Sequence, residues 1–143
     1  MGKLKGQDVL NGSFVEIWLD DEIVAEATAL QAKVEFQTED LKFAGDLFQH
    51  RKVVGYKGSG SLSMHKVSTR FQKAVSDTMK TGKERYYTLI YKLDDPAVDG
   101  QERVVLKDVA FDDLTIIDLE VGTTMKLEVP FSFSSYDFLD SIN

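Results

Sequence analysis

The fold is decided by a glycine-rich stretch in the middle of the chain, GYKGSGSLSMHKVS at residues 55–68. As far as the histidine, its side chains alternate between two kinds. One set is glycine or apolar: Tyr56, Gly58, Gly60, Leu62 and Met64. The other set is polar and mostly small: Lys57, Ser59, Ser61, Ser63 and His65. Successive residues of a β-strand point to opposite faces of a sheet, so this pattern predicts a strand with one polar face.

The same stretch could instead be a phosphate-binding loop, and its sequence argues against that. Gly55 and Gly60 have the separation of a P-loop, but Ser61 and Leu62 follow where lysine and serine are needed. The helical pattern that comes next begins about seven residues too late for its N-terminus to face a phosphate. We therefore expect no cofactor here. We expect Gly58 and Gly60 to leave room where another backbone approaches the strand.

A second stretch with strict alternation lies upstream. One parity holds Leu30, Ala32, Val34 and Phe36, and the other holds Gln31, Lys33, Glu35 and Gln37. The whole extended segment runs from Glu22 to Gln37, and at about 15 residues it exceeds the usual strand length. Either it bends, or it reaches past the core of its own domain.

The rest of the chain predicts further strands and a single helix. Strands are expected at 14–19, 87–93, 103–111, 114–119 and 127–133, and the parity of 103–111 slips near Lys107 and Asp108, as at a β-bulge. Apolar residues at helical spacing, between Ser68 and Gly82, predict a helix over about 68–81. Residues 38–55 have no clean period and are expected to form a long loop. We predict a single domain over 1–143 that is mainly β (α+β). Its architecture is an antiparallel β-sandwich or barrel of about six or seven strands with one flanking helix.

Composition excludes several classes of function. The chain has 143 residues and no cysteine, which removes disulfides, thiolate nucleophiles and cysteine metal sites. Its formal charge is −7, and we expect no specific nucleic-acid binding, because affinity for the phosphate backbone comes from Lys and Arg. No run of about 18 apolar residues is present, so we expect no membrane insertion by the monomer.

No catalytic or metal-binding pattern is evident. The histidines are His50 and His65, and they lack the HxH or HxxxH spacing of a metal site. The acidic pairs at 20–21, 94–95 and 112–113 each lie where a turn is expected, and aspartate stabilises turns through its own side chain. No G-x-S-x-G nucleophile motif is present. We therefore expect no enzyme, no cofactor and no metal.

The order of these signals resembles the tail tube proteins of contractile-tailed phages, of the type found in defective prophages such as PBSX. The resemblance runs through nearly the whole chain. Its segments are NGSFVEIWLDDEIVAEATALQAKVEF at 11–36, GYKGSGSLSMHKVSTRF at 55–71, KTGKERYYTLIYKLDDPAVDGQERVVLKDVAFDDL at 80–114 and EVPFSFSSYDFLD at 128–140. The more specific of them are the G-x-G strand that leads into HKVSTRF and the segment from DDP through GQERV.

The resemblance implies a structural protein without catalytic activity. Tube proteins of this family have a small β-sandwich or barrel with one flanking helix, and six copies form a ring whose inner sheets line a channel. Rings stack into a tube that is enclosed by a sheath, initiated on a baseplate and assembled around a tape-measure protein. DNA passes down the tube, and assembly takes place in the cytoplasm of the bacterial host. The parent particle stays open between a phage, a defective prophage and a contractile bacteriocin.

Parity and the resemblance together select candidate site residues. For the surface that faces the channel they select Ser59, Ser61 and Ser63 first, and Gln31, Lys33 and Glu35 second. For the stacking of rings, the expected loop offers apolar residues that need a cover: Leu41, Phe43, Leu47 and Phe48. The alternative function, from a different class, is a small β-barrel that binds an apolar ligand in an enclosed cavity.

Overall fold

The computed structural model describes residues 4–10 and 12–142, and within them the chain is mainly β. The strands are β1 (Val15–Leu19), β2 (Glu22–Ile23), β3 (Ala27–Leu41), β4 (His50–His65), β5 (Tyr87–Leu93), β6 (Glu102–Phe111), β7 (Lys126–Phe133) and β8 (Ser135–Asp140). One α-helix, α1 (Arg70–Lys80), and two 3-10 turns, η1 (Gly6–Asp8) and η2 (Gly12–Phe14), complete the described elements. No helix in this part of the chain is long and apolar enough to cross a membrane. The predicted class, mainly β with one helix, is confirmed.

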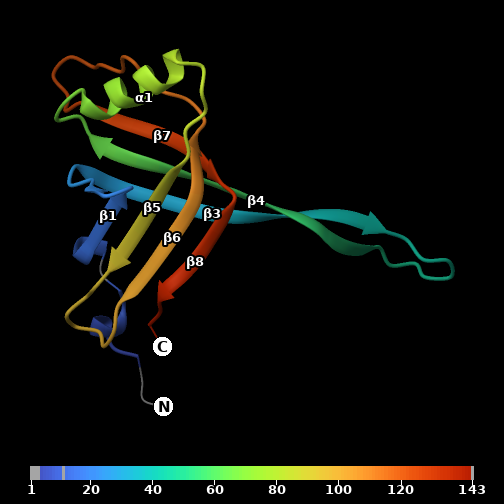
Figure 1. Cartoon of the computed structure of the whole chain (residues 1–143). Helices are drawn as coiled ribbons and strands as arrows, with labels where there is room; N and C mark the ends of the chain where they lie inside the picture. The colour runs from blue at the N-terminus through green and yellow to red at the C-terminus, as the bar shows by residue number, and fades with distance from the viewer. Residues whose placement is uncertain (1–3, 11, 143) are drawn as a thin grey trace.

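The strands form one antiparallel sheet that folds over on itself to make two layers (Figure 1). The order along the sheet is β2-β1-β5-β6-β7-β4-β3, and β8 pairs with β6 outside this path. The sheet is not closed into a barrel, since β2 and β3 share no ladder in the described residues. The fold therefore leaves strand edges open.

β6 belongs to both layers because it bends within its length. Its first part pairs with β5 and β8, and its last two residues pair with β7. In the ladder with β5, Tyr87 lies opposite Val109 while Leu89 lies opposite Leu106, so β6 contains one extra residue. Asp108 lies in this bulge with a φ of 55°, in the left-handed region. The predicted slip of parity is confirmed, and the bulge is where the chain turns from one layer to the other.

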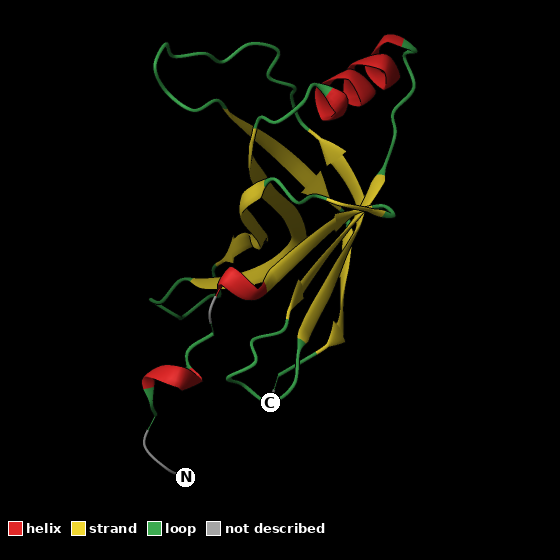
Figure 2. Ribbon diagram, turned by 90° about the vertical axis from the view of Figure 1, so that its left-hand side faces the viewer, coloured by secondary structure: helices red, strands yellow, loops and turns green. Residues whose placement is uncertain are grey.

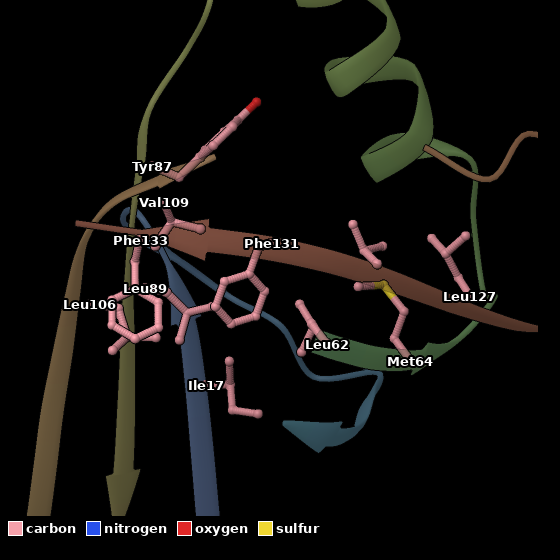
Figure 3. Packing of buried hydrophobic residues seen from close by; sticks show 11 residues of the cluster. Ile17, Leu62, Met64, Tyr87, Leu89, Leu106, Val109, Leu127, Phe131 and Phe133 are labelled. Carbon is pink, nitrogen blue, oxygen red and sulfur yellow. The ribbon is translucent and has the colours of Figure 1, made fainter. Parts of the chain in front are cut away.

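The core lies between the two layers, and α1 covers one end of it (Figures 2 and 3). Its largest fully buried side chains are Phe131, Leu62, Leu89, Val109 and Val129. The helix is anchored by Phe71, whose ring meets Phe111 edge-on at a centroid distance of 5.3 Å. Gln72 also donates from Nε2 to the backbone oxygen of Thr115 at 2.7 Å. These contacts attach α1 to the sheet and to the segment that follows β6.

The predicted loop at 38–55 is wrong in most of its length. β3 continues to Leu41 and β4 begins at His50, so the connecting loop is 42–49. Leu41, a predicted stacking residue, is partly buried at the end of β3. A register shift beside Gln37 interrupts the parity, and charged residues lie on both faces, which hid the strands. Opposite charges face each other there, Glu39 opposite Lys52 for example, and such pairs stabilise a ladder.

Two smaller predictions also need correction. The predicted strand at 114–119 is absent, and 112–125 has no regular structure. The backbone of this segment is held by Gln72 of α1 instead. The Nε2 of Gln72 donates to the carbonyl oxygens of Thr115 and Ile116. The helix is shorter than 68–81, because Thr69 at its N-cap has non-helical backbone angles. Gly82 has a φ of 74° just past the helix, which confirms the predicted glycine stop.

Candidate functional site

The residues predicted to face a channel lie together on one side of the sheet. Gln31 of β3 lies opposite Ser61 of β4, and Lys33 lies opposite Ser59. Glu35 follows on the same side, with its carboxylate 3.2 Å from Nζ of Lys33. Directly opposed residues of neighbouring strands share a face, so the pairing joins the two predicted sets into one surface.

This surface continues from β4 onto β7. Ser59, Ser61 and Ser63 lie opposite Ser132, Pro130 and Glu128 respectively. The side chains of Gln31, Lys33 and Glu35 are exposed, whereas the three serines are partly covered. We name the set of Gln31, Lys33, Glu35, Ser59, Ser61, Ser63, Glu128 and Ser132 the polar face. It spans three neighbouring strands, β3, β4 and β7. The apolar residue at its centre is Pro130, which lies opposite Ser61.

The other side of β4 is packed, and its glycines make room for two phenylalanine rings. A Cβ atom at Gly60 would meet the backbone oxygen of Gln31 and would lie 2.7 Å from Cζ of Phe131. At Gly58 it would lie 2.6 Å from both Cε2 and the backbone oxygen of Phe133. The expected approach of another backbone is confirmed, and the aromatic rings of β7 were not foreseen. These glycines serve the core.

β3 and β4 run beyond the other strands as a two-stranded arm (Figure 1). β7 pairs with β4 from Gly58 onward, so residues 35–57, which we name the arm, have no third strand beside them in the described structure. Phe36 and Tyr56 face each other across the arm with their rings edge-on at 5.6 Å. They are 62% and 70% exposed. The sequence alternation places Phe36 on the same face as Leu30 and Val34, which predicted that its ring would be buried. The strand has already left the core at Phe36, so the ring is exposed.

The arm ends in a turn that directs apolar side chains outward. Leu47 is 100% exposed and Phe48 is 81% exposed. Asp46 organises this turn, because its carboxylate accepts the backbone N–H of Phe48 at 2.9 Å and lies 2.6 Å from Nε2 of His50. The hydrogen bond with His50, followed by the one from Phe48, lowers the pKa of Asp46. Phe43 packs edge-on against the His50 ring at 5.3 Å, so Leu47 and Phe48 are the stacking candidates that point away from the chain.

β8 carries a second exposed apolar surface, which the sequence analysis missed. Tyr136 lies opposite Leu106 and Phe138 lies opposite Val104, so both rings are on the side of the sheet that faces the core. They are nevertheless 47% and 62% exposed. β8 pairs with β6 on one side and has no strand on its other side in the described chain. The alternation through Ser135–Asp140 is the signal that identifies this strand.

Comparison with known proteins identifies the family of this chain. The family model described as phage tail tube protein matches residues 2–140. This chain belongs to the phage tail tube protein family. It is similar to the XkdM protein of the phage-like element PBSX of Bacillus subtilis (strain 168), with 32% identity over 142 residues. That match covers 98% of this chain and 97% of XkdM.

Two solved structures share the fold of this tail tube protein at low sequence identity. One is the tube-terminating cap of the anti-feeding prophage, with a TM-score of 0.76 and 10% identity, covering 98% of this chain and 97% of that one. The other is the sheath–tube complex, in its extended state, of the extracellular contractile injection system PVC. Its TM-score is 0.74 at 7% identity, and the match covers 93% of each chain. At these identities the likeness concerns the fold alone.

As a tail tube protein, the chain is a structural component of the tail of a phage or phage-like particle and not an enzyme. Its acidic turn residues have structural roles. Asp20 accepts the backbone N–H of Thr88 at 2.9 Å and pairs with Arg85 at 3.2 Å, and Asp95 accepts the backbone N–H of Ala97 at 2.9 Å. Among the residues that the structure describes, no group of three or more His, Asp or Glu side chains is placed to hold a metal.

Proposed function

We propose that this tail tube protein closes into hexameric rings, and that the rings stack into a tube whose channel carries DNA. The observation that carries the proposal is the open sheet, whose strands β3 and β8 each lack a partner on one side in the described chain. An exposed strand edge readily pairs with another chain. A head-to-tail contact between identical copies that closes on itself gives a ring, in which each such edge is covered.

The polar face supplies the channel wall in this proposal. Its centre consists of small hydroxyl side chains, and the charges of Lys33 and Glu35 lie 3.2 Å apart and offset each other. Such a wall stays hydrated and offers no cluster of Lys and Arg to hold a phosphate backbone. The formal charge of −7 on each copy further disfavours adhesion of DNA. DNA can therefore move along the wall without binding to it.

The tip of the arm is the proposed stacking element. It presents Leu47 and Phe48 fully or largely to solvent, at the point of the chain farthest from the core. Large apolar side chains at such a position are typical of an interaction site. Phe43 packs edge-on against His50 beside the same turn, and Leu41 is partly buried at the end of β3. Contact of this tip with the next ring would bury the side chains of Leu47 and Phe48.

The proposed partners follow from the family. They are other copies of this chain, a tail sheath, a baseplate or other initiator, and a tape-measure protein, with DNA present in transit. The tube in the similar PVC structure is solved together with its sheath, which supports the first of the heterologous partners. Assembly would take place in the cytoplasm of a bacterial host, and we propose no cofactor.

Electron microscopy of the concentrated chain, with and without a baseplate extract, tests the proposal. Rings with six-fold symmetry or stacked tubes are expected, and the extract should increase the number of tubes. An extract is included because a subunit can stay monomeric until an initiator is present. A chain that remains monomeric in both samples and takes up an apolar ligand would favour the small ligand-binding barrel instead.

A further inference from the structure

The connection between β6 and β7, residues 112–125, is a part of the chain to which the proposed tube gives no role. We name it the acidic segment, because it holds four acidic residues and no basic one. It passes beside α1, whose Gln72 donates to two of its carbonyl oxygens (Figure 1). Its sequence predicts a strand, yet it has no regular structure. The pattern and the structure therefore differ within this one segment.

A strand has to pair with another strand, and the acidic segment pairs with none in the described chain. β6 and β7, the strands that it connects, pair with each other and leave it outside the sheet. Among the described residues, no backbone N–H of residues 114–121 donates a hydrogen bond to the protein. Unpaired backbone groups of this kind are what an exposed strand offers to another chain.

One side of the alternation in this segment is apolar and largely exposed. Ile117 is 80% exposed, Leu119 61% and Val121 93%. Asp118 and Glu120 lie between them, so an extended backbone places the apolar side chains on one side and the carboxylates on the other. Large apolar side chains that gather in solvent mark an interaction site. The segment thus has the side chains of a half-buried strand without the surface that would bury them.

Charge indicates which kind of partner supplies that surface. In the described structure no ion pair within 4.0 Å engages the four acidic residues of this segment, which are Asp112, Asp113, Asp118 and Glu120. The open edges of a second copy do not complement them. β8 carries Asp137 and Asp140 without a basic residue, and β3 holds three acidic residues and one lysine. Like charges on adjacent strands are destabilising, so the acidic segment fits a different protein with lysine or arginine beside its strand edge.

We propose that residues 114–121 add as a β-strand to an open, basic strand edge of the tail sheath subunit. The inference rests on the proposed tube and its sheath, and it names the segment that binds the sheath and the way it binds. The N–H groups of 114–121 join the ladder of the partner sheet, as in other cases of β-strand addition. Ile117, Leu119 and Val121 then face the apolar interior of the partner. Asp118 and Glu120 meet its cations.

Hydrogen exchange measured by mass spectrometry tests the strand directly. Three samples are compared: the unassembled chain, tubes of this chain, and tubes mixed with the sheath subunit of the same particle. The amides of 114–121 should exchange rapidly in the first two samples. In the third they should exchange at least about tenfold more slowly, because a ladder hydrogen bond has to open before exchange.

Each other outcome decides against a stated part of the inference. Protection that is already present in tubes without sheath overturns the choice of the sheath, because a second copy is then the partner. Sheathed tubes without protection overturn the inference and leave the tube proposal intact. If the chain forms no tubes, the unassembled chain is mixed with the sheath subunit instead. Protection then supports the strand and counts against the tube, and its absence overturns the strand as well.

Proline substitutions test the backbone part of the contact. Ile116→Pro with Leu119→Pro removes one N–H from each side of the strand, so the ladder loses a donor in either orientation. The amount of sheath that sediments with tubes should fall several-fold. Thr124→Pro, exposed in the same segment but outside 114–121, is the matched control and should leave that amount unchanged. The midpoint of urea denaturation should not change in either variant, and equal sheath binding by the two variants would contradict the strand.

A charge reversal tests the electrostatic part of the contact. Asp118→Lys with Glu120→Lys should lower the amount of bound sheath several-fold, because the proposed edge is basic. Asp21→Lys with Asp99→Lys changes the net charge by the same amount at two exposed positions outside the acidic segment. This control should bind sheath as the parent does. Equal losses in the two variants would show that net charge is the cause and would overturn the basic edge.

Discussion

At the residue scale, the glycines of β4 show how a local pattern and a distant contact depend on each other. Gly58 and Gly60 occupy positions on the core side of β4, where an apolar side chain would be expected. The rings of Phe133 and Phe131 occupy that space instead. The missing side chains of one strand are thus replaced by the large side chains of the next.

This arrangement predicts a stability cost for a single methyl group. Gly60→Ala places a Cβ 2.7 Å from Cζ of Phe131 and against the backbone oxygen of Gln31, and the backbone cannot move aside easily. The free energy of unfolding should fall by about 1–3 kcal/mol, as for other overpacked cores. Urea denaturation measures the change. Gly6→Ala is the control, because no atom lies within 4 Å of its added methyl group, and its effect should stay within about 0.5 kcal/mol.

At the element scale, β6 is the strand that makes two layers from one sheet. Its bulge carries Asp108 at a φ of 55°. Val109 beyond it still pairs with Tyr87 of β5, and the last two residues, Ala110 and Phe111, pair with β7. The carboxylate of Asp108 also accepts a hydrogen bond from Oγ of Ser134 at 3.4 Å. The layers therefore depend on one residue that tolerates a left-handed backbone.

Substitution at this bulge should separate conformation from side-chain contacts. Asp108→Val should lower the free energy of unfolding by about 2 kcal/mol, since a β-branched residue is strained in the left-handed region. Asp108→Gly loses the same hydrogen bond without the strain and should change stability by less than about 1 kcal/mol. Equal losses in the two variants, measured by urea denaturation, would show that the backbone angle is not the cause.

The arm is the second element with a separable role. Leu47→Ser with Phe48→Ser should leave the free energy of unfolding within about 0.5 kcal/mol of the parent, because neither side chain contacts the core. The same change should abolish the formation of tubes in the electron microscope while single rings persist. Lys42→Ser with Gln49→Ser, also exposed at the tip, is the matched control and should still form tubes. Tubes of normal length from the Leu47 and Phe48 variant would exclude the tip as the stacking element.

At the scale of the whole molecule, the sheet is unfinished. In the described residues it has open edges at β3 and β8 and an arm with no third strand beside it, and these lie around a core that is itself well packed. A lone molecule with these features is prone to pair with others. In the proposed rings, identical copies complete these features.

The proposed tube predicts which side of the sheet becomes enclosed. Ser61→Cys lies at the centre of the polar face and should react in the unassembled chain with both a small maleimide and a bulky polymer-linked one. In tubes it should react with the small reagent and be protected from the bulky one, because the channel admits only narrow reagents. Equal labelling by both reagents in tubes would place the polar face outside the channel.

Much of this fold could be predicted because side-chain alternation is local. The strict periods of Leu30–Gln37 and of 55–65 identify two strands and their polar side, and the slip at Lys107–Asp108 identifies the bulge. The candidate channel residues came from the same parity, and the register of β3 with β4 brings them together. The arm was hidden because its charges lie on both faces, where no core selects one of them.

The sequence by itself determined the strand periods, the stop of the helix at Gly82, the polar side of β3 and β4, and the family, since each depends on residues near one another in the chain. Only the tertiary structure decided where β3 and β4 leave the core, how β6 divides its partners between two layers, and that β8 exposes Tyr136 and Phe138. The physical reason is that these features depend on which strands pair. Pairing brings together residues far apart in the chain, and no local period records it.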